Sequence, residues 1–436
     1  MSRGGERHFG LDRGSLAPAA ALVVLVVSIL IAEASGALTA VREVDGTIVV
    51  AGGTLVDGTV REPFPGVTIV ARSGRLAEVT AGQVVGLPAG TETIDARGKW
   101  IVPGLIDMHV HYQPAWMDAL FLRHGVTTVR DVGSGLNHIL ERREENRSPG
   151  SPRPRIFACG PLIDGPFPRH GTGISVSVQT VGEARAVARQ LIERGVDCLK
   201  LYEQLTPPLV EAVVHEADGT SVPVTAHLRD TTALQALEIG VRGLEHAFGF
   251  DACEHGAAAD VLRRVVERGA YVVPTLAITE QVSLLGSPEQ ERMPLLEEVP
   301  AGRRLYWRRT AAGTPQDRIA GAARRLGCIK SFVARLQRAG GHVVAGSDTS
   351  NPYVIPGASL HRELELLVDA GLSPREALAT ATRNAAAFLG QARTLGTLEV
   401  GKTADLVVLG ADPLVSVAAL RQIELVIRDG RVVWRR

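Results

Sequence analysis

Eight apolar, strand-like runs alternate with amphipathic stretches across the middle of the chain, and this alternation constrains the fold more than any other feature. The runs are IVPGLIDMHVH (101–111), TTVRDV (127–132), RIFACGPLI (155–163), DCLKLY (197–202), VPVTAH (222–227), RGLEHA (242–247), YVVPTL (271–276) and HVVAGSDT (342–349). Strands that alternate with helices form parallel sheets, and eight such units predict a closed (β/α)8, TIM-like barrel. In these barrels the functional residues lie at the carboxyl ends of the strands.

Short β-branched runs broken by glycine lie near both ends of the chain. TIVVAGGTLVDG and VTIVARSGRLAEV precede the barrel, and TADLVVLG and LVIRDGRVVWRR follow it. The pair Asp429-Gly430 is a strong signal for a hairpin turn. We therefore expect an α/β protein in which residues 45–100 and 391–436 form one small β-sandwich domain. The barrel is expected over residues 101–390.

The first residues have the pattern of a targeting segment. Several arginines precede the uncharged run LAPAAALVVLVVSILIA (16–32), and Ala32 begins the small-x-small sequence Ala-Glu-Ala, a candidate cleavage site. This order favours a cleaved signal peptide over a retained anchor for residues 1–36. The protein is therefore expected to be exported, either to the periplasm or cell exterior or as a membrane-anchored form. Membrane contact is expected only through such an anchor.

Charge and cysteine content narrow the class of partner. The 47 acidic residues balance the 47 basic ones, so the sequence offers no electrostatic footprint for nucleic acid. A small-molecule partner is expected, and assembly into a homo-oligomer is left open. The cysteines form no Cys-x-x-Cys pair, which argues against a thiolate zinc site but leaves disulfides open. They are Cys159, Cys198, Cys253 and Cys328.

Polar residues end several of the predicted strands. His109 and His111 close the first run, and their spacing of two places both imidazoles on one side of a strand. His227, His246 and Asp348 close three later runs. Imidazoles and a carboxylate that converge on one barrel mouth predict a metal site.

Lys200 lies in the middle of the apolar run DCLKLY, in a chain that has only four lysines. Burial of an ammonium lowers its pKa, so part of the population becomes a neutral, nucleophilic amine. Such an amine can add CO2 and form a carbamate, an anionic ligand that can bridge two cations. The alternatives are a lysine that extends to solvent or one that pairs with a nearby carboxylate.

The motifs resemble those of the amidohydrolase superfamily of metal-dependent hydrolases, in particular its imidazolonepropionase-like and prolidase-like branch. The resemblance covers nearly all of the chain after the leader. Its marks are PGLIDMHVH, HGVTTVRDVG, the lysine strand, TAH, LEHA, AGSDT, GTLEVGKTADLVVL and ADPL.

The resemblance implies a centre of two divalent metal ions, with zinc favoured. It assigns His109, His111 and Asp348 to one ion, His227 and His246 to the other, and carboxylated Lys200 to the bridge. It further implies hydrolysis of an amide bond by an activated water, with Asp348 as general base and then general acid. A dipeptide, an N-acyl amino acid or a cyclic amide is the expected substrate.

Three further residues are candidates for substrate binding. His170 lies in PFPRHGTGISV, where relatives often carry a glycine-rich loop, and a solvent-exposed loop histidine is the alternative. Tyr202 shares a strand face with Lys200, and Arg229 follows His227. The long, charged segment 280–314 is expected to form a lid or substrate loop.

Two other functions remain open. One is a deaminase-like or ring-opening amidohydrolase with a single metal, in which Asp230 joins the chemistry and Lys200 is structural. The other is a barrel that binds a ligand without catalysis. Metal content separates the first of these from the two-metal hydrolase, and a binding barrel has no need of a complete set of ligands.

Overall fold

The computed structural model describes residues 46–113, 116–148, 151–171, 173–247 and 249–436. The predicted leader, residues 1–36, lies outside this part. In the part that the structure covers, no helix is both long and apolar enough to cross a membrane.

The central region is a parallel α/β barrel whose strands follow one another in chain order, except that the short strand β10 lies beside β9 and does not pair with β11. One sheet has the order β6-β7-β8 and the other has the order β10-β9-β11-β12-β13-β14-β15. The strands are β6 (Leu105–Val110), β7 (Val126–Asp131), β8 (Arg155–Ala158), β9 (Leu162–Asp164), β10 (Ser175–Ser177), β11 (Leu199–Leu201), β12 (Val224–Ala226), β13 (Gly243–Glu245), β14 (Tyr271–Val273) and β15 (His342–Val343). All pairings within these two sheets are parallel.

Backbone hydrogen bonds close the ring between the last strand and the first. The Met108 N–H donates to the Ala345 carbonyl at 3.0 Å, and the Asp348 N–H donates to the His109 carbonyl at 2.8 Å. Each predicted run contributes a strand, but the third is divided at Gly160-Pro161 into β8 and β9. Proline cannot donate to a ladder, so the break lets β8 pair with β7 and β9 pair with β11.

Helices cover the barrel through amphipathic faces. In α4, for example, the residues Ala184, Ala188 and Leu191 are buried at helical spacing, and Thr180 caps the first turn by accepting from the Glu183 N–H. The helices that follow barrel strands are α2 (Trp116–Arg123), α3 (Leu136–Arg147), α4 (Val181–Glu193), α5 (Pro207–Ala217), α6 (Ala233–Ile239), α7 (His255–Arg268), α12 (Ala358–Asp369), α13 (Pro374–Thr380) and α14 (Arg383–Phe388).

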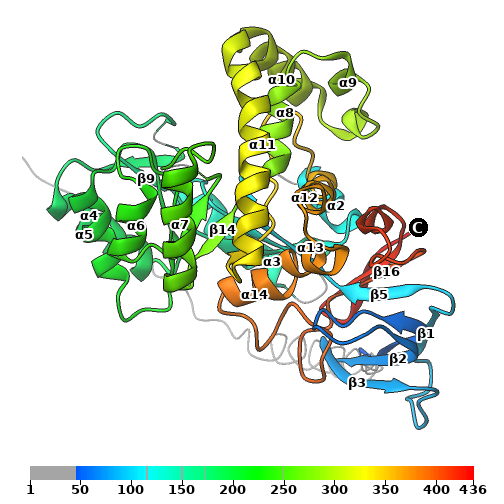
Figure 1. Cartoon of the computed structure of the whole chain (residues 1–436). Coiled ribbons are helices and arrows are strands. Elements are labelled where there is room, and N and C mark those ends of the chain that lie inside the picture. Colours follow the sequence, from blue (N-terminus) through cyan, green and yellow to red (C-terminus); the bar gives the residue numbers. More distant parts are fainter. Residues whose placement is uncertain (1–45, 114–115, 149–150, 172, 248) are drawn as a thin grey trace, which may run out of the picture. The chain divides into compact units, whose positions relative to one another are not determined.

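A helical insert, residues 276–338, separates β14 from β15. It contains α8 (Leu276–Ser283), α9 (Pro288–Glu291), the 3₁₀ turn η1 (Leu296–Glu298), α10 (Ala301–Gly313) and α11 (Gln316–Arg338). Figure 1 shows α8 and α10 beside α11, and α8 packs directly against α11. Trp307 of α10 is fully buried and packs with Tyr353 in a small core of its own. The predicted lid segment is therefore mainly helical.

Both ends of the described chain contribute to one further sheet, of order β18-β17-β16-β5-β1-β2-β3, with β4 paired to β1. Its strands are β1 (Ile48–Leu55), β2 (Phe64–Arg72), β3 (Arg75–Ala81), β4 (Glu92–Asp95), β5 (Trp100–Pro103), β16 (Leu406–Leu409), β17 (Ile423–Arg428) and β18 (Arg431–Arg435). Asp429 (φ 49°) and Gly430 (φ 69°) form the predicted hairpin turn. The structure shows a single mixed sheet here, so a separate β-sandwich domain stays a prediction.

All four cysteines are paired. Cys159 joins Cys198, which links the β8–β9 corner to the residue before β11. Cys253 joins Cys328, which links the segment before α7 to the middle of α11. The sequence left the pairing open, and the structure resolves it.

Candidate active site

The polar residues predicted at the strand ends come together at the mouth of the barrel. They line one cavity of about 990 Å³, together with residues of the helical insert. The predicted metal ligands that line it are His109, His111, Lys200, His227, His246 and Asp348. The geometry therefore places all six at one site, as the spacing of the strands predicts.

Asp348 lies among the imidazoles. Its Oδ1 is 3.1 Å from the Nε2 of His111 and 3.5 Å from the Nε2 of His109. Its Oδ2 is 3.8 Å from the Nδ1 of His246, whose ring centroid lies 4.7 Å from that of His227. Burial alone would raise the pKa of Asp348, but the surrounding histidines hold it below its usual value.

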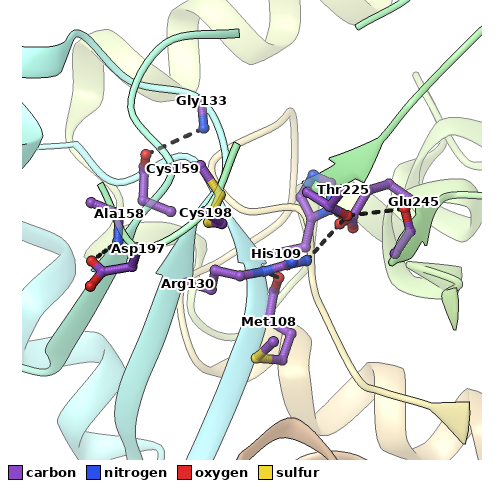
Figure 2. The surroundings of a disulfide bond; sticks show 12 residues. Met108, His109, Arg130, Gly133, Ala158, Cys159, Asp197, Cys198, Thr225 and Glu245 are labelled. Carbon is purple, nitrogen blue, oxygen red and sulfur yellow. Dashed lines mark hydrogen bonds and ion pairs between the residues drawn. A yellow bond between two sulfur atoms is a disulfide. The ribbon is translucent and has the colours of Figure 1, made fainter. Parts of the chain in front are cut away.

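A buried carboxylate fixes the orientation of His109. Glu245 Oε2 accepts from His109 Nδ1 at 2.7 Å, and its other oxygen accepts from Arg130 at 2.6 Å and from the Thr225 hydroxyl. Figure 2 shows this network beside the disulfide between β8–β9 and β11. Because a carboxylate only accepts, Nδ1 of His109 carries the proton and Nε2 keeps its lone pair. Burial lowers the pKa of His109 to about 4, so the ring is neutral, as a metal ligand must be.

The hydroxyl of Thr275 orients His246. It donates to the Pro274 carbonyl at 2.8 Å and accepts from His246 Nδ1 at 2.6 Å. Thr275 (φ 47°), His246 (φ 60°) and Asp348 (φ 62°) all have left-handed backbones. Such conformations are costly for residues with side chains and concentrate at functional sites, where the surrounding structure holds them.

Lys200 extends from the middle of β11 into the buried side of the cluster. The residue is 1% exposed, and within the described residues its Nζ has no hydrogen-bond partner. Burial lowers its pKa to about 8. The burial of Lys200 excludes extension of its side chain to solvent, and the lack of a partner for Nζ excludes a direct carboxylate contact in the described part of the chain.

The cluster fits divalent cations. His109, His246 and Asp348 offer ligand atoms that all lie within 4.8 Å of one another, and all three residues are buried. Neutral imidazoles and a carboxylate are the donor set that zinc prefers. The unpartnered Nζ of Lys200 fits a further anionic ligand, because a carbamate at this atom would face cations instead of lacking a partner.

Two of the three predicted substrate contacts line the cavity. His170 Nε2 lies 3.1 Å from the Tyr202 hydroxyl, and the Tyr202 ring packs edge-on against His227. Arg229 is exposed and pairs with Glu203 at 3.1 Å and with Asp230 at 3.2 Å. Neither Arg229 nor Asp230 is among the residues that line the cavity.

Sequence reasoning missed the network behind His109. Glu245 and Arg130 are charged residues inside apolar strand runs, and both are almost completely buried. A charged residue inside an apolar strand run could have predicted a buried ion pair, because buried charges are usually paired. The positions of Thr275 and of the insert's side chains had no comparable signal.

Comparison with known proteins agrees with this geometry. The amidohydrolase family model matches residues 100–433. The chain is 27% identical over 381 residues to an imidazolonepropionase of Geobacillus kaustophilus, a match that covers 79% of this chain and 83% of that protein. It is 24% identical over 416 residues to an adenine deaminase of Paracoccus denitrificans, covering 88% of this chain but only 57% of the deaminase.

Solved structures show the same fold. A crystal structure from Bifidobacterium longum, described as that of a prolidase, superimposes with a TM-score of 0.75 at 28% sequence identity. The superposition covers 89% of this chain and 95% of that one. The extent of the family match, together with the histidine and aspartate cluster, shows that the chain belongs to the amidohydrolase family and is a hydrolase of carbon–nitrogen bonds.

Proposed function

We propose that the protein hydrolyses an amide bond of a small molecule at a centre of two divalent cations, with zinc favoured. The observation that carries this proposal is the buried Nζ of Lys200, which lacks a partner yet lies at the same site as the histidines and Asp348. As a carbamate, formed by addition of CO2 with loss of a proton, Lys200 would bridge the cations. A dipeptide, an N-acyl amino acid or a cyclic amide is the proposed substrate class.

The residues that would hold the cations are His109, His111, His227, His246, Asp348 and carboxylated Lys200. When bound, such cations supply Lewis acidity, which polarises a carbonyl and acidifies water. Glu245 and Thr275 keep two imidazoles in the tautomer that ligation requires.

Asp348 is the proposed proton carrier. It lies at the centre of the cluster and is ionised in the neutral pH range, since its pKa is below the usual value. It accepts a proton from the attacking water and then donates it to the nitrogen of the leaving amine. The water oxygen first bonds to the carbonyl carbon, and the bond to nitrogen breaks once the nitrogen has received the proton, so the products are a carboxylic acid and an amine.

The pair His170 and Tyr202 is proposed to contact the substrate. Both line the cavity, and the Tyr202 hydroxyl stays protonated because burial raises its pKa above the usual value. A neutral phenol can donate to a carbonyl or carboxylate oxygen of the substrate. Arg229 is directed to Glu203 in this structure, so it is the weaker candidate.

A single-metal deaminase is the second candidate. An adenine deaminase is among the relatives, and the ligand atoms of His109, His246 and Asp348 lie close enough together to hold one ion. That reading gave a role to Asp230, which is exposed and paired with Arg229. The placement of Asp230 therefore favours the two-metal reading.

Export is proposed from two independent features. Residues 1–36 have the composition of a signal peptide, and both disulfides would persist in an oxidising compartment. Sequencing of the protein from its native host should find an N-terminus near Ser35. A detergent-extracted chain that still begins at Met1 would show an anchor instead.

The proposed activity is tested by metal analysis of the purified protein, followed by a screen of Xaa-Pro and other dipeptides, N-acyl amino acids and cyclic amides. About two metal ions per chain and release of a free amine are expected. About one ion per chain with release of ammonia from a purine would establish the deaminase.

A further inference from the structure

Three helices of the insert each present one face to the cavity. Four residues in α8 and just after it line the cavity, and three of them are apolar: Ile278, Thr279, Val282 and Leu285. On α10 the lining residues are Arg303, Tyr306 and Thr310, and on α11 they are Arg318, Ala322 and Arg325. The wall is thus mainly apolar along α8, while α10 contributes one arginine and α11 contributes two.

Two of these arginines have charges that other side chains leave uncompensated. Neither Arg303 nor Arg318 forms an ion pair with another described residue, whereas most arginines around the barrel do. Arg303 lies over the ring of Tyr306 at 5.8 Å, which holds the guanidinium beside the cavity wall. An arginine at a cavity wall without a carboxylate partner is suited to bind an anion.

The acidic residues of the cavity lie elsewhere. Among the described residues that line it, the carboxylates are Glu203 and Asp348, and both follow barrel strands. Glu203 already pairs with Arg169 at 3.0 Å, and Asp348 lies among the histidines. Arg303 and Arg318 therefore meet no carboxylate among the described residues that line the cavity beside α10 and α11.

The axis of α11 carries part of the cavity wall away from the strand ends. α11 runs back to β15 at its C-terminal end, so Arg318 in its first turn lies farther from the barrel than Arg325 does. Seven residues of helix correspond to about 10 Å along the axis. A cavity of about 990 Å³ is at the upper end of the range for small-molecule sites, and it exceeds what a dipeptide needs.

We propose that Arg303 and Arg318 form a distal anion subsite, which selects an extended amide with an apolar middle and a carboxylate at its far end. The proposal rests on the amide hydrolysis inferred above, because the scissile bond must lie at the strand ends. The apolar side chains of α8 bind the middle of this substrate. A short dipeptide cannot reach both places.

Calorimetry on the metal-loaded protein tests the subsite. The ligands are linear α,ω-dicarboxylates with four to about twelve carbons, and the affinity of each is compared with that of the monocarboxylate of equal length. One carboxylate binds at the strand ends and the other reaches the arginines. At the best chain length we expect the second carboxylate to raise affinity about tenfold, and added salt to reduce this gain. Arg303→Gln and Arg318→Gln should each remove most of it.

Arg309→Gln and Arg324→Gln are matched controls, since they remove the same charge from the same helices at exposed positions that do not line the cavity. They should leave the gain unchanged. The proposal is overturned if dicarboxylates have no advantage at any length, or if the control variants lose as much as the wall variants. If no amide is hydrolysed in the screen but dicarboxylates still bind more tightly in an arginine-dependent way, the proposed hydrolysis is rejected and the anion subsite is retained.

Discussion

Two regions face the same cavity but differ in construction. One is the strand-end cluster of histidines, Lys200 and Asp348, together with Glu245, the partner of His109, and the other is the helical wall of α8, α10 and α11. Lys200 and Glu245 are buried and held by strands whose register leaves one orientation for each side chain. Arg318 and Tyr306 are exposed on helices of an insert whose small core is distinct from the main core of the barrel, although Leu120 of α2 also contributes to it. The cluster therefore suits chemistry, which needs fixed geometry, and the wall suits selection of the substrate.

The difference also predicts how each region responds to substitution. A change in the cluster removes a partner from a buried charge, which is costly in stability and in activity. A change in the wall removes a solvated charge, which alters affinity for one class of substrate and little else. Substitutions can therefore test whether the two regions are as independent as their structures indicate.

The largest effect is expected at Lys200. Lys200→Ala should lose the bridging ligand and lower turnover at least about a thousandfold, and Lys200→Arg should fail equally because a guanidinium stays positive. Formate, acetate or propionate should partly restore Lys200→Ala by occupying the vacated space. Lys330→Ala, which removes an α11 lysine paired with Asp369, is the control and should be nearly neutral. Wild-type turnover of Lys200→Arg with two metals bound would exclude the carbamate.

Asp348→Asn should lower turnover by about 10²- to 10⁴-fold while much of the metal stays bound, because an amide offers an oxygen ligand but cannot carry the proton. Metal content and turnover are measured on the same sample. Asp230→Asn is the matched control, and it should keep wild-type turnover. The reverse result would favour the single-metal reading.

Glu245→Gln should weaken metal binding about 10- to 100-fold, since His109 loses the carboxylate that orients it. It should also lower the melting temperature, because Arg130 would stay buried without an anionic partner. Glu203→Gln breaks pairs with two partly exposed arginines and should change stability by less than about 1 kcal/mol. Equal loss of stability in both variants would contradict the contrast between buried and exposed pairs.

The smallest effect is expected where the two regions meet. Tyr353, in the segment after Asp348, donates its hydroxyl to Glu291 of α9 at 2.8 Å. Tyr353→Phe should reduce the free energy of unfolding by about 0.5–1.5 kcal/mol, as measured by urea denaturation, with the turnover number unchanged. A large fall in turnover would show that the insert helps to set the geometry of Asp348.

Much of the cluster could be predicted from sequence because five of the six predicted ligands, all except Lys200, lie at or near the end of an apolar run. The order of the runs fixes the order of the strands, and parallel strands bring their carboxyl ends to one mouth. His109, His246 and Asp348 needed no knowledge of long-range packing. The hairpin at Asp429-Gly430 was equally local, since left-handed backbone at both positions suits these residues.

The remainder depends on contacts between distant residues. The bond from Arg130 to Glu245 joins positions 115 residues apart, and no local pattern states which buried charges will meet. The division of the third run depends on pairing of β8 and β9 with different neighbours. Arginines at a helix surface look alike in sequence, so only the packing of α8, α10 and α11 distinguishes Arg318 from Arg324.

The disulfide between Cys253 and Cys328 has a consequence for how substrates enter. Cys328 lies three residues beyond Arg325 on α11, and Cys253 lies just before α7, which packs against the same helix. The covalent bond ties the middle of α11 to the segment before α7, so this part of the helix cannot move away from the barrel while the disulfide is intact. A substrate must therefore fit the cavity on its α11 side as it stands, because it cannot push this part of the helix outward.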